Sequence, residues 1–104
     1  MRNVVWTHAA EADLQEVYND LEAFREGSGD SFLSLIDASM ELLRQFPEMA
    51  PVFEGRVRRL LVNDRKHGLF YVIEDRGIVL HALADLRRDP SDLGRRFRKL
   101  IGGQ

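Results

Sequence analysis

The chain of 104 residues contains no cysteine, which excludes a disulfide framework and any metal site built on thiolates. It has only three histidines, and their scattered positions do not match the spacing of a structural zinc site. The glycine motifs of P-loops and dinucleotide-binding folds are missing as well. The sequence therefore predicts neither a metal nor a cofactor.

Long apolar runs are also missing. No stretch approaches the roughly 18 apolar residues that span a bilayer, and the first residues lack the apolar core of a signal peptide. Together with the absence of cysteine, this predicts a cytoplasmic protein that makes no membrane contact.

Basic residues are scarce in the first half of the chain. Residues 1–55 contain three basic residues against eleven acidic ones, a net charge of −8, whereas residues 56–104 contain twelve against six, a net charge of +6. Such a polarised surface can steer an anionic partner toward one side. Alternatively, the two halves simply neutralise each other in the fold.

What the chain does contain is enough for one domain over residues 1–104. At this length, with 44% hydrophobic residues, one core can form and a second domain has no room.

The segment 56–90 predicts the scaffold of that domain. It has three apolar runs rich in Val, Ile, Leu, Phe and Tyr, which predict antiparallel strands at residues 57–62, 69–73 and 78–84. The links are short enough for hairpins, and Gly77 can adopt the positive φ that a tight turn needs.

The residues before this segment predict a short strand and two helices. Residues 3–6 are β-prone, and helical spacing of apolar residues follows Thr7 up to Gly27. After a turn at residues 28–30, a second amphipathic helix extends to Phe46, where Pro47 stops it. We expect the two helices to form an antiparallel hairpin on one face of the sheet. Residues 47–55 form a connection of no predicted shape.

Both faces of the last strand are partly apolar. Alternation places Ile78, Leu80, Ala82 and Ala84 on one side and Val79, His81, Leu83 and Asp85 on the other. The helices cover one face, so the other is predicted to be open and to receive a partner. Ser91 can cap a final basic helix through Leu93, Phe97, Leu100 and Ile101. The predicted class is α+β, with the order β-α-α-β-β-β-(α).

In this order the chain resembles toxins of the ParE/RelE superfamily from bacterial type II toxin-antitoxin modules. The resemblance rests on the opening VVWTHAAEADLQEVY, the helix ending LLRQFPEM, the run RRLLV, the strand with Tyr71 and the late LRRDP. It implies a two-helix hairpin packed on a small, mainly antiparallel sheet. It also implies a cognate antitoxin that silences the toxin.

The resemblance leaves two activities open. RelE-like members are metal-independent ribonucleases that cleave mRNA at the ribosome, whereas ParE-like members inhibit DNA gyrase. RNA cleavage needs a proton acceptor, a proton donor and cations near the phosphate. In this chain the candidates for the ribonuclease set are Arg59, Arg65, Lys66, His81 and Arg87, and His67 and Tyr71 are further possible proton carriers.

The nuclease-type members resemble one another in placing a Tyr or His after the last strand. Here no Tyr, His or Glu follows His81, and Ala84-Asp85-Leu86 stands where many relatives have a His before the Arg pair. The resemblance therefore favours the gyrase inhibitor. A degenerate member that only binds an antitoxin is a third possibility.

The histidines and aromatic residues also have structural interpretations. A turn position predicts that His67 is solvated, and the strand around His81 predicts that it is packed. Phe70 and Phe97 are expected in the core rather than as platforms for RNA bases.

Arginines are the candidates for binding the target or the antitoxin. The set comprises Arg56, Arg58, Arg59, Arg87, Arg88, Arg95, Arg96 and Arg98. They can form a basic rim for an acidic antitoxin segment, gyrase or phosphate. Alternatively, those at the strand ends form surface ion pairs with Asp85, Asp89 and Asp92. These are Arg56, Arg58, Arg59, Arg87 and Arg88. The predicted partners are an antitoxin and DNA gyrase, or the ribosome and mRNA, and the chain can form a homodimer or a hetero-oligomer with its antitoxin.

Overall fold

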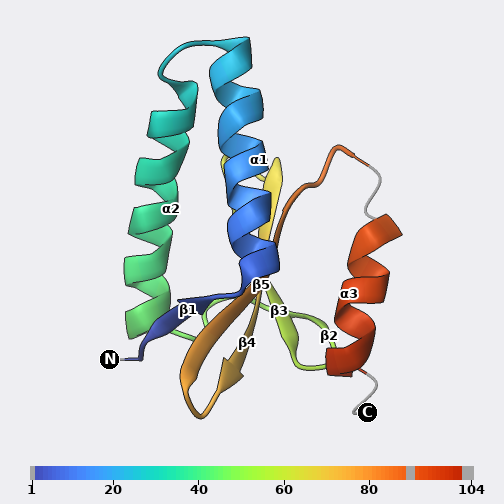
Figure 1. Ribbon diagram of the computed structural model, residues 1–104. Coiled ribbons are helices and arrows are strands. Elements are labelled where there is room, and N and C mark those ends of the chain that lie inside the picture. Colours follow the sequence, from blue (N-terminus) through green and yellow to red (C-terminus); the bar gives the residue numbers. More distant parts are fainter. Residues whose placement is uncertain (1, 89–90, 102–104) are drawn as a thin grey trace.

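A pair of helices packs on one face of a five-stranded sheet, and a third helix packs on the other face (Figure 1). The computed structural model describes residues 2–88 and 91–101. The elements follow the order β1 (Val4–Trp6), α1 (His8–Phe24), α2 (Ser28–Gln45), β2 (Val52–Glu54), β3 (Val57–Val62), β4 (His67–Glu74), β5 (Gly77–Asp85) and α3 (Ser91–Ile101). The predicted α+β class and the helical hairpin on the sheet are confirmed.

The sheet has the order β1-β5-β4-β3-β2, and only β1 and β5 pair in parallel. The three predicted strands form β3, β4 and β5, and Gly77 begins β5 with a φ of 133°. The strand β2 was not predicted. It has three residues between Pro51 and Gly55, so its sequence is too short for a period-2 pattern, and it forms because β3 offers an edge to pair with.

The helical hairpin turns earlier than predicted. Thr7 caps α1 by accepting a hydrogen bond from the Ala10 N–H at 3.1 Å. The chain reverses after Phe24, and Gly27 adopts a left-handed φ of 88°. Residues 28–30 are the first turn of α2 and not a loop, since the Glu22 carboxylate accepts hydrogen bonds from the N–H groups of Gly27 and Gly29.

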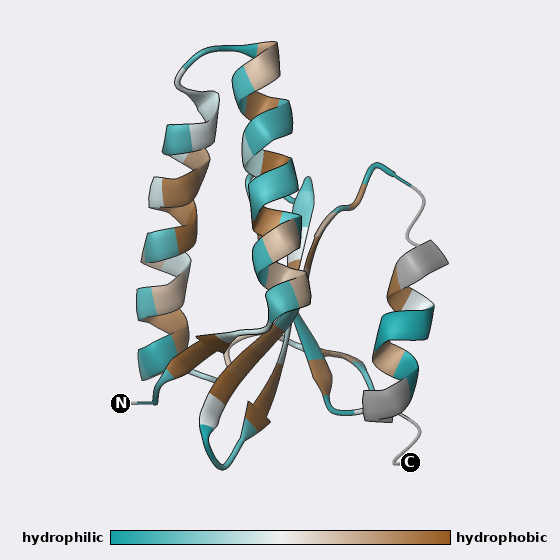
Figure 2. Cartoon of the chain, in the orientation of Figure 1, coloured by the Kyte–Doolittle hydropathy of each residue, from teal (hydrophilic) through white to brown (hydrophobic). Residues whose placement is uncertain are grey.

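The main core lies between the hairpin and the sheet. Leu43 from α2 packs there with Leu69, Tyr71 and Leu80 from the two central strands, and all four are buried. Figure 2 shows these central strands as largely hydrophobic, while α1 and α2 carry both hydrophobic and hydrophilic stretches. The helices therefore present one face to the sheet and one to solvent.

A bulge in β5 changes which residues share a face. Tyr71 pairs with Leu80 and Phe70 with Ala82, so His81 has no partner on β4. Ile78, Leu80 and Leu83 consequently belong to the core under the hairpin, while Ala82 and Ala84 pack on the opposite face. The predicted alternation is wrong beyond His81, because the extra residue shifts the pattern by one position.

The face opposite the hairpin was predicted to be open, and this is wrong. Phe97 and Leu93 of α3 pack there against Phe70, Val72 and Val57. The Phe97 and Phe70 rings lie 5.1 Å apart, and both side chains are 1% exposed. Both are core residues, as predicted. The chain's own C-terminal helix forms the second layer over this face.

Candidate functional site

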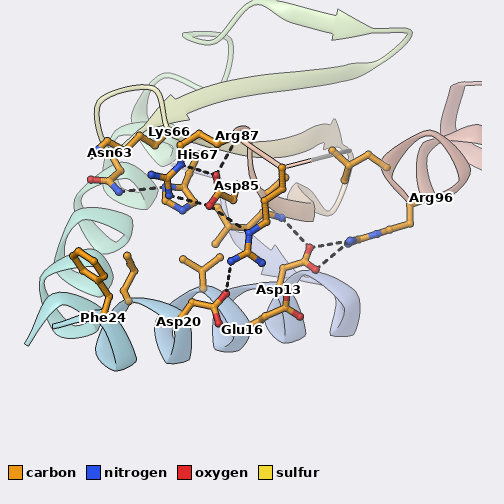
Figure 3. A pocket seen from close by; sticks show the side chains of 16 residues that line it. Asp13, Glu16, Asp20, Phe24, Asn63, Lys66, His67, Asp85, Arg87 and Arg96 are labelled. Carbon is orange, nitrogen blue, oxygen red and sulfur yellow. Dashed lines mark hydrogen bonds and ion pairs between the residues drawn. The ribbon is translucent and has the colours of Figure 1, made fainter. Parts of the chain in front are cut away.

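A cleft lies between α1, the turn before β4 and the turn after β5 (Figure 3). It has a volume of about 480 Å³. Its apolar lining includes Val17, Leu21 and Leu83, and Phe24 lies at one end. The charged residues that line it are the acidic Asp13, Glu16, Asp20 and Asp85 and the basic Lys66, Arg87, Arg88 and Arg96. Among the described lining residues the two signs balance, so the cleft itself is not a basic pocket.

Asp85 ends β5 and binds Arg87, two residues later. The Arg87 guanidinium donates two hydrogen bonds of 3.0 Å to the carboxylate, and the Arg87 backbone N–H donates a third of 3.0 Å. These hydrogen bonds lower the pKa of Asp85 to about 2 and raise the pKa of Arg87. The charge of Arg87 is therefore largely compensated, although its side chain is 61% exposed.

Arg88 connects this turn to α1. One guanidinium nitrogen lies 3.2 Å from the Asp20 carboxylate and another lies 3.8 Å from that of Asp85. The ion pair with Asp20 crosses the cleft between segments 68 residues apart (Figure 3). Both side chains are about half exposed, so the pair is accessible to competition by another carboxylate.

Arg96 has the most buried ion pair of the cleft. Its guanidinium donates to both oxygens of Asp13, at 2.9 and 3.2 Å, and also donates to the carbonyl oxygen of His81. Asp13 in turn accepts the backbone N–H of Leu83 at 3.0 Å. Because these contacts tie α3 and α1 to the bulge of β5, Arg96 supports the fold and is not presented to a partner.

The turn before β4 contains Lys66 and leads into His67, and both residues line the cleft. Asn63, Asp64 and Arg65 all have positive φ, between 55° and 66°, a conformation that costs about 1 kcal/mol or more per non-glycine residue. The Asn63 side chain lies 3.2 Å from Nδ1 of His67, and the Phe32 ring lies 4.9 Å from its ring. These contacts help to hold the turn.

His67 was predicted to be a solvated turn residue, and this is wrong. Its side chain is 2% exposed because it begins β4 and lies beneath α2. Burial lowers the pKa of His67, and the nearby Asp85 carboxylate opposes that shift. The neutral ring behaves as a core residue.

Tyr71 and His81 are no better placed to carry a proton to a substrate. Tyr71 is fully buried, and its hydroxyl donates a 2.7 Å hydrogen bond to the Pro47 carbonyl. His81 is half-buried, as predicted, and its Nε2 lies 3.8 Å from the Glu74 carboxylate. Burial lowers the pKa of His81, with Glu74 opposing the shift. Within the described residues this Nε2 has no hydrogen-bond partner.

The residues predicted for a ribonuclease are not brought together. Lys66 and Arg87 line the cleft, but Arg59, Arg65 and His81 are not among the lining residues that the structure describes. Arg59 lies over the Phe53 ring at 5.0 Å instead, on β3. Of the three predicted proton carriers, His67 alone is among the described lining residues, and it is 2% exposed.

The arginines predicted to bind partners divide into two groups. Arg87, Arg88 and Arg96 have the carboxylate partners given above, and Arg58 donates at 2.7 Å to the Ala50 carbonyl with Glu48 at 3.9 Å. In contrast, within residues 2–88 and 93–98, Arg56, Arg59 and Arg98 make no ion pair, and neither does Arg65 of the ribonuclease set. Arg95 is exposed on α3. The predicted pairing with Asp85 is confirmed for Arg87 and Arg88; Asp89 and the Asp92 side chain lie outside the described residues.

Sequence reasoning missed the carboxylates of α1 that complete the cleft. These carboxylates belong to Asp13 and Asp20. Their spacing of seven residues places them on one face of α1, and this was the available signal. The arginines they bind lie about 70 to 80 residues further along the chain, so only the tertiary fold brings them together.

Within the described residues, no group of three or more His, Asp or Glu side chains is arranged to hold a metal ion. No described helix is both long and apolar enough to cross a bilayer.

Comparison with known proteins points to one family. The family model for the ParE toxin of type II toxin-antitoxin system, parDE, matches residues 4–90. No curated protein matches the sequence significantly. Among solved structures, the chromosomal ParDE TA system from P. aeruginosa contains a similar chain, with a TM-score of 0.71 and 18% identity. The match covers 82% of this chain and 96% of that one, and at this identity it establishes a shared fold.

Proposed function

Because the chain belongs to the ParE toxin family of type II toxin-antitoxin systems, we propose that it inhibits DNA gyrase by protein binding and that a cognate antitoxin neutralises it. The proposal places the chain in the cytoplasm, where gyrase acts on DNA.

The state of the proton carriers is the observation that favours binding over catalysis. His67 is 2% exposed, and the Tyr71 hydroxyl is bonded to a backbone carbonyl. His81 is outside the cleft, with its Nε2 directed at Glu74. A general acid or base must reach the substrate within hydrogen-bond distance or through one water. His67 lines the cleft beside Lys66 but is almost fully buried, and Tyr71 and His81 are not among the described lining residues, so none of the three reaches a substrate held there.

The charges of the cleft support the same choice. A nuclease binds RNA through cations that are free to contact phosphates. Here Arg87, Arg88 and Arg96 are matched by Asp85, Asp20 and Asp13. A protein surface that presents carboxylates and guanidinium groups suits this alternating pattern better than a polyanion does.

Phe24 is the residue we assign to the contact with gyrase. It ends α1, it lies at one end of the cleft, and its side chain is 87% exposed. Large aromatic side chains frequently anchor protein interfaces. The exposed guanidinium groups of Arg87 and Arg88 lie along the same cleft and can form the rim of the interface.

Induced expression followed by assays on the purified chain tests the proposal. We expect growth arrest that the product of the adjacent reading frame reverses, and loss of gyrase supercoiling activity at saturating toxin. Unaffected supercoiling together with cleaved ribosome-bound mRNA would refute the gyrase proposal in favour of a ribonuclease. Normal growth with folded protein would indicate a degenerate member that only binds an antitoxin.

A matched pair of variants tests the assigned contact. Phe24→Ser is expected to raise the toxin concentration needed for half inhibition of gyrase by about tenfold, the effect of losing one interface anchor. Phe46→Ser is the control, because Phe46 is 58% exposed at the opposite end of the hairpin. Equal inhibition by the two variants would remove Phe24 from the interface.

A further inference from the structure

A second surface lies at the far edge of the sheet, away from the cleft. The strand β2 ends the sheet, and all three of its residues are exposed. Its outer backbone edge pairs with no strand within the described part of the chain. An open edge of this kind can accept an extended peptide through main-chain hydrogen bonds.

Beside this edge, aromatic and cationic groups gather on the face covered by α3. Phe53 is 44% exposed, with its ring 5.2 Å from the buried Phe70 ring and the Arg59 guanidinium 5.0 Å above it. Leu61, two residues from Arg59 on the same strand face, is 38% exposed. Arg56 is exposed in the turn between β2 and β3. We call Phe53, Arg56, Arg59 and Leu61 the edge patch.

The edge patch differs from the cleft in its charges. The cleft arginines have carboxylate partners, whereas Arg56 and Arg59 make no ion pair with any described residue. A cation held over an aromatic ring beside an exposed leucine presents both charge and apolar area. Such a surface is complementary to a segment that alternates carboxylates with apolar side chains.

We propose that the edge patch and β2 bind an acidic, extended segment of the antitoxin, added to the sheet as a strand beside β2. The inference rests on the proposed function, since that function supplies the antitoxin as the dedicated partner. In the complex, the apolar side chains of the segment cover Phe53 and Leu61, and its carboxylates meet Arg56 and Arg59. The cleft and Phe24 take no part in this contact.

Binding of purified, fluorescently labelled antitoxin to the full chain tests the proposal. We expect Phe53→Ser to weaken the affinity at least tenfold, as the loss of an aromatic anchor does. Arg59→Glu should weaken it by a similar factor and reduce its dependence on salt. Met49→Ser and Arg76→Glu are the controls. Met49 is 44% exposed like Phe53, and Arg76 lies in the turn before β5.

Circular dichroism of each variant verifies the fold. If Phe53→Ser does not fold, the affinities of Arg56→Glu and Arg59→Glu decide the outcome. A labelled ten-residue peptide alternating Glu with Val should compete with the antitoxin, whereas its Lys counterpart should not. Affinity within twofold of the wild type for the folded patch variants overturns the proposal. Competition by a DNA duplex or by gyrase, in place of the acidic peptide, also overturns it.

The same variants separate this inference from the proposed function. A chain with Phe53→Ser or Arg59→Glu should still arrest growth, and the antitoxin should no longer rescue the cells. If the wild-type chain fails to inhibit gyrase, the proposed function fails, while the antitoxin affinities still decide whether the edge patch is its binding surface.

Discussion

At the scale of single residues, Asp13 joins segments that are far apart in the sequence. Its carboxylate accepts a hydrogen bond from the Leu83 N–H of β5, and it binds the Arg96 guanidinium of α3. The Asp13 and Arg96 side chains are each 22% exposed. Removing one partner of such a pair leaves a charge and a backbone donor without compensation.

We predict that Asp13→Ala lowers the free energy of unfolding by about 1–3 kcal/mol, as measured by urea denaturation. Asp13→Asn should cost less, because its amide oxygen can still accept the Leu83 N–H. Asp20→Ala is the control. Asp20 and Arg88 are 49% and 61% exposed, so losing their pair should cost less than about 1 kcal/mol. Equal losses for Asp13 and Asp20 would contradict the assignment.

The buried His67 predicts a dependence of stability on pH. Burial holds its folded-state pKa below the ordinary value of 6.5, so protons bind the unfolded chain first. The stability that neutral His67 contributes is present above pH 6.5 and is lost as the pH falls below that value. Urea midpoints between pH 7.5 and 5 should decrease, and His67→Asn should flatten the slope. An unchanged slope in the variant would contradict the burial argument; His81, whose pKa is also lowered, accounts for a remaining slope.

At the scale of elements, α3 decides the shape of the binding surfaces. Its apolar side fills the sheet face opposite the hairpin, with Phe97 on Phe70 and Leu93 beside them. On its basic side, the Arg96 guanidinium donates a hydrogen bond to the Asp13 carboxylate of α1. Under the two proposals, gyrase meets the α1 cleft and the antitoxin meets the edge patch, and neither partner meets an open sheet face.

We predict that Phe97→Ala costs about 3–5 kcal/mol of unfolding free energy, the usual loss for a buried phenylalanine. Phe97 is 1% exposed, whereas Phe24 is 87% exposed. Phe24→Ala should therefore change stability by less than about 0.5 kcal/mol, since exposed positions contribute little. Thermal or urea unfolding measures both. If Phe97→Ala were as mild as Phe24→Ala, the packing of α3 on the sheet would be in doubt.

At the scale of the whole molecule, the two oppositely charged halves meet at the cleft. The acidic α1 supplies Asp13 and Asp20, and the basic C-terminal half supplies Arg96 and Arg88. Part of the charge asymmetry is therefore neutralised inside the fold, as the simpler of the two interpretations predicted. Among the described residues, no carboxylate forms an ion pair with Arg56 or Arg59 of the edge patch, so an effect of the asymmetry on partner binding stays a prediction.

The contacts between the halves also predict one cooperative unfolding transition. The hairpin shares its core with β4 and β5, and α3 packs on the other face of the same strands. Fluorescence of Trp6 in β1 and helical circular dichroism should therefore give coincident denaturation curves. Two separate transitions would contradict the prediction of one domain over residues 1–104.

Much of this architecture was predictable because its causes are local. Periodicities of 3.6 and 2 identified α1, α2 and the strands β3 to β5, and Thr7, Pro47 and Gly77 marked boundaries that the structure retains or nearly retains. The strand β2 was not predicted, because three residues are too few to show the period-2 alternation of a strand. The faces of β5 were wrong beyond His81 because a bulge arises from pairing with a neighbour and not from the strand's own residues.

The sequence by itself determined the class of fold, the order of the elements and the charge of each half, since these depend on residue type and short-range spacing. Only the tertiary structure decided that α3 closes the second sheet face and that Asp13 and Asp20 neutralise Arg96 and Arg88. It also decided that Arg56 and Arg59 have no carboxylate partner in the part of the chain that the structure describes. The physical reason is that burial and ion pairing depend on contacts between residues up to 83 positions apart, and no local pattern encodes which of them meet.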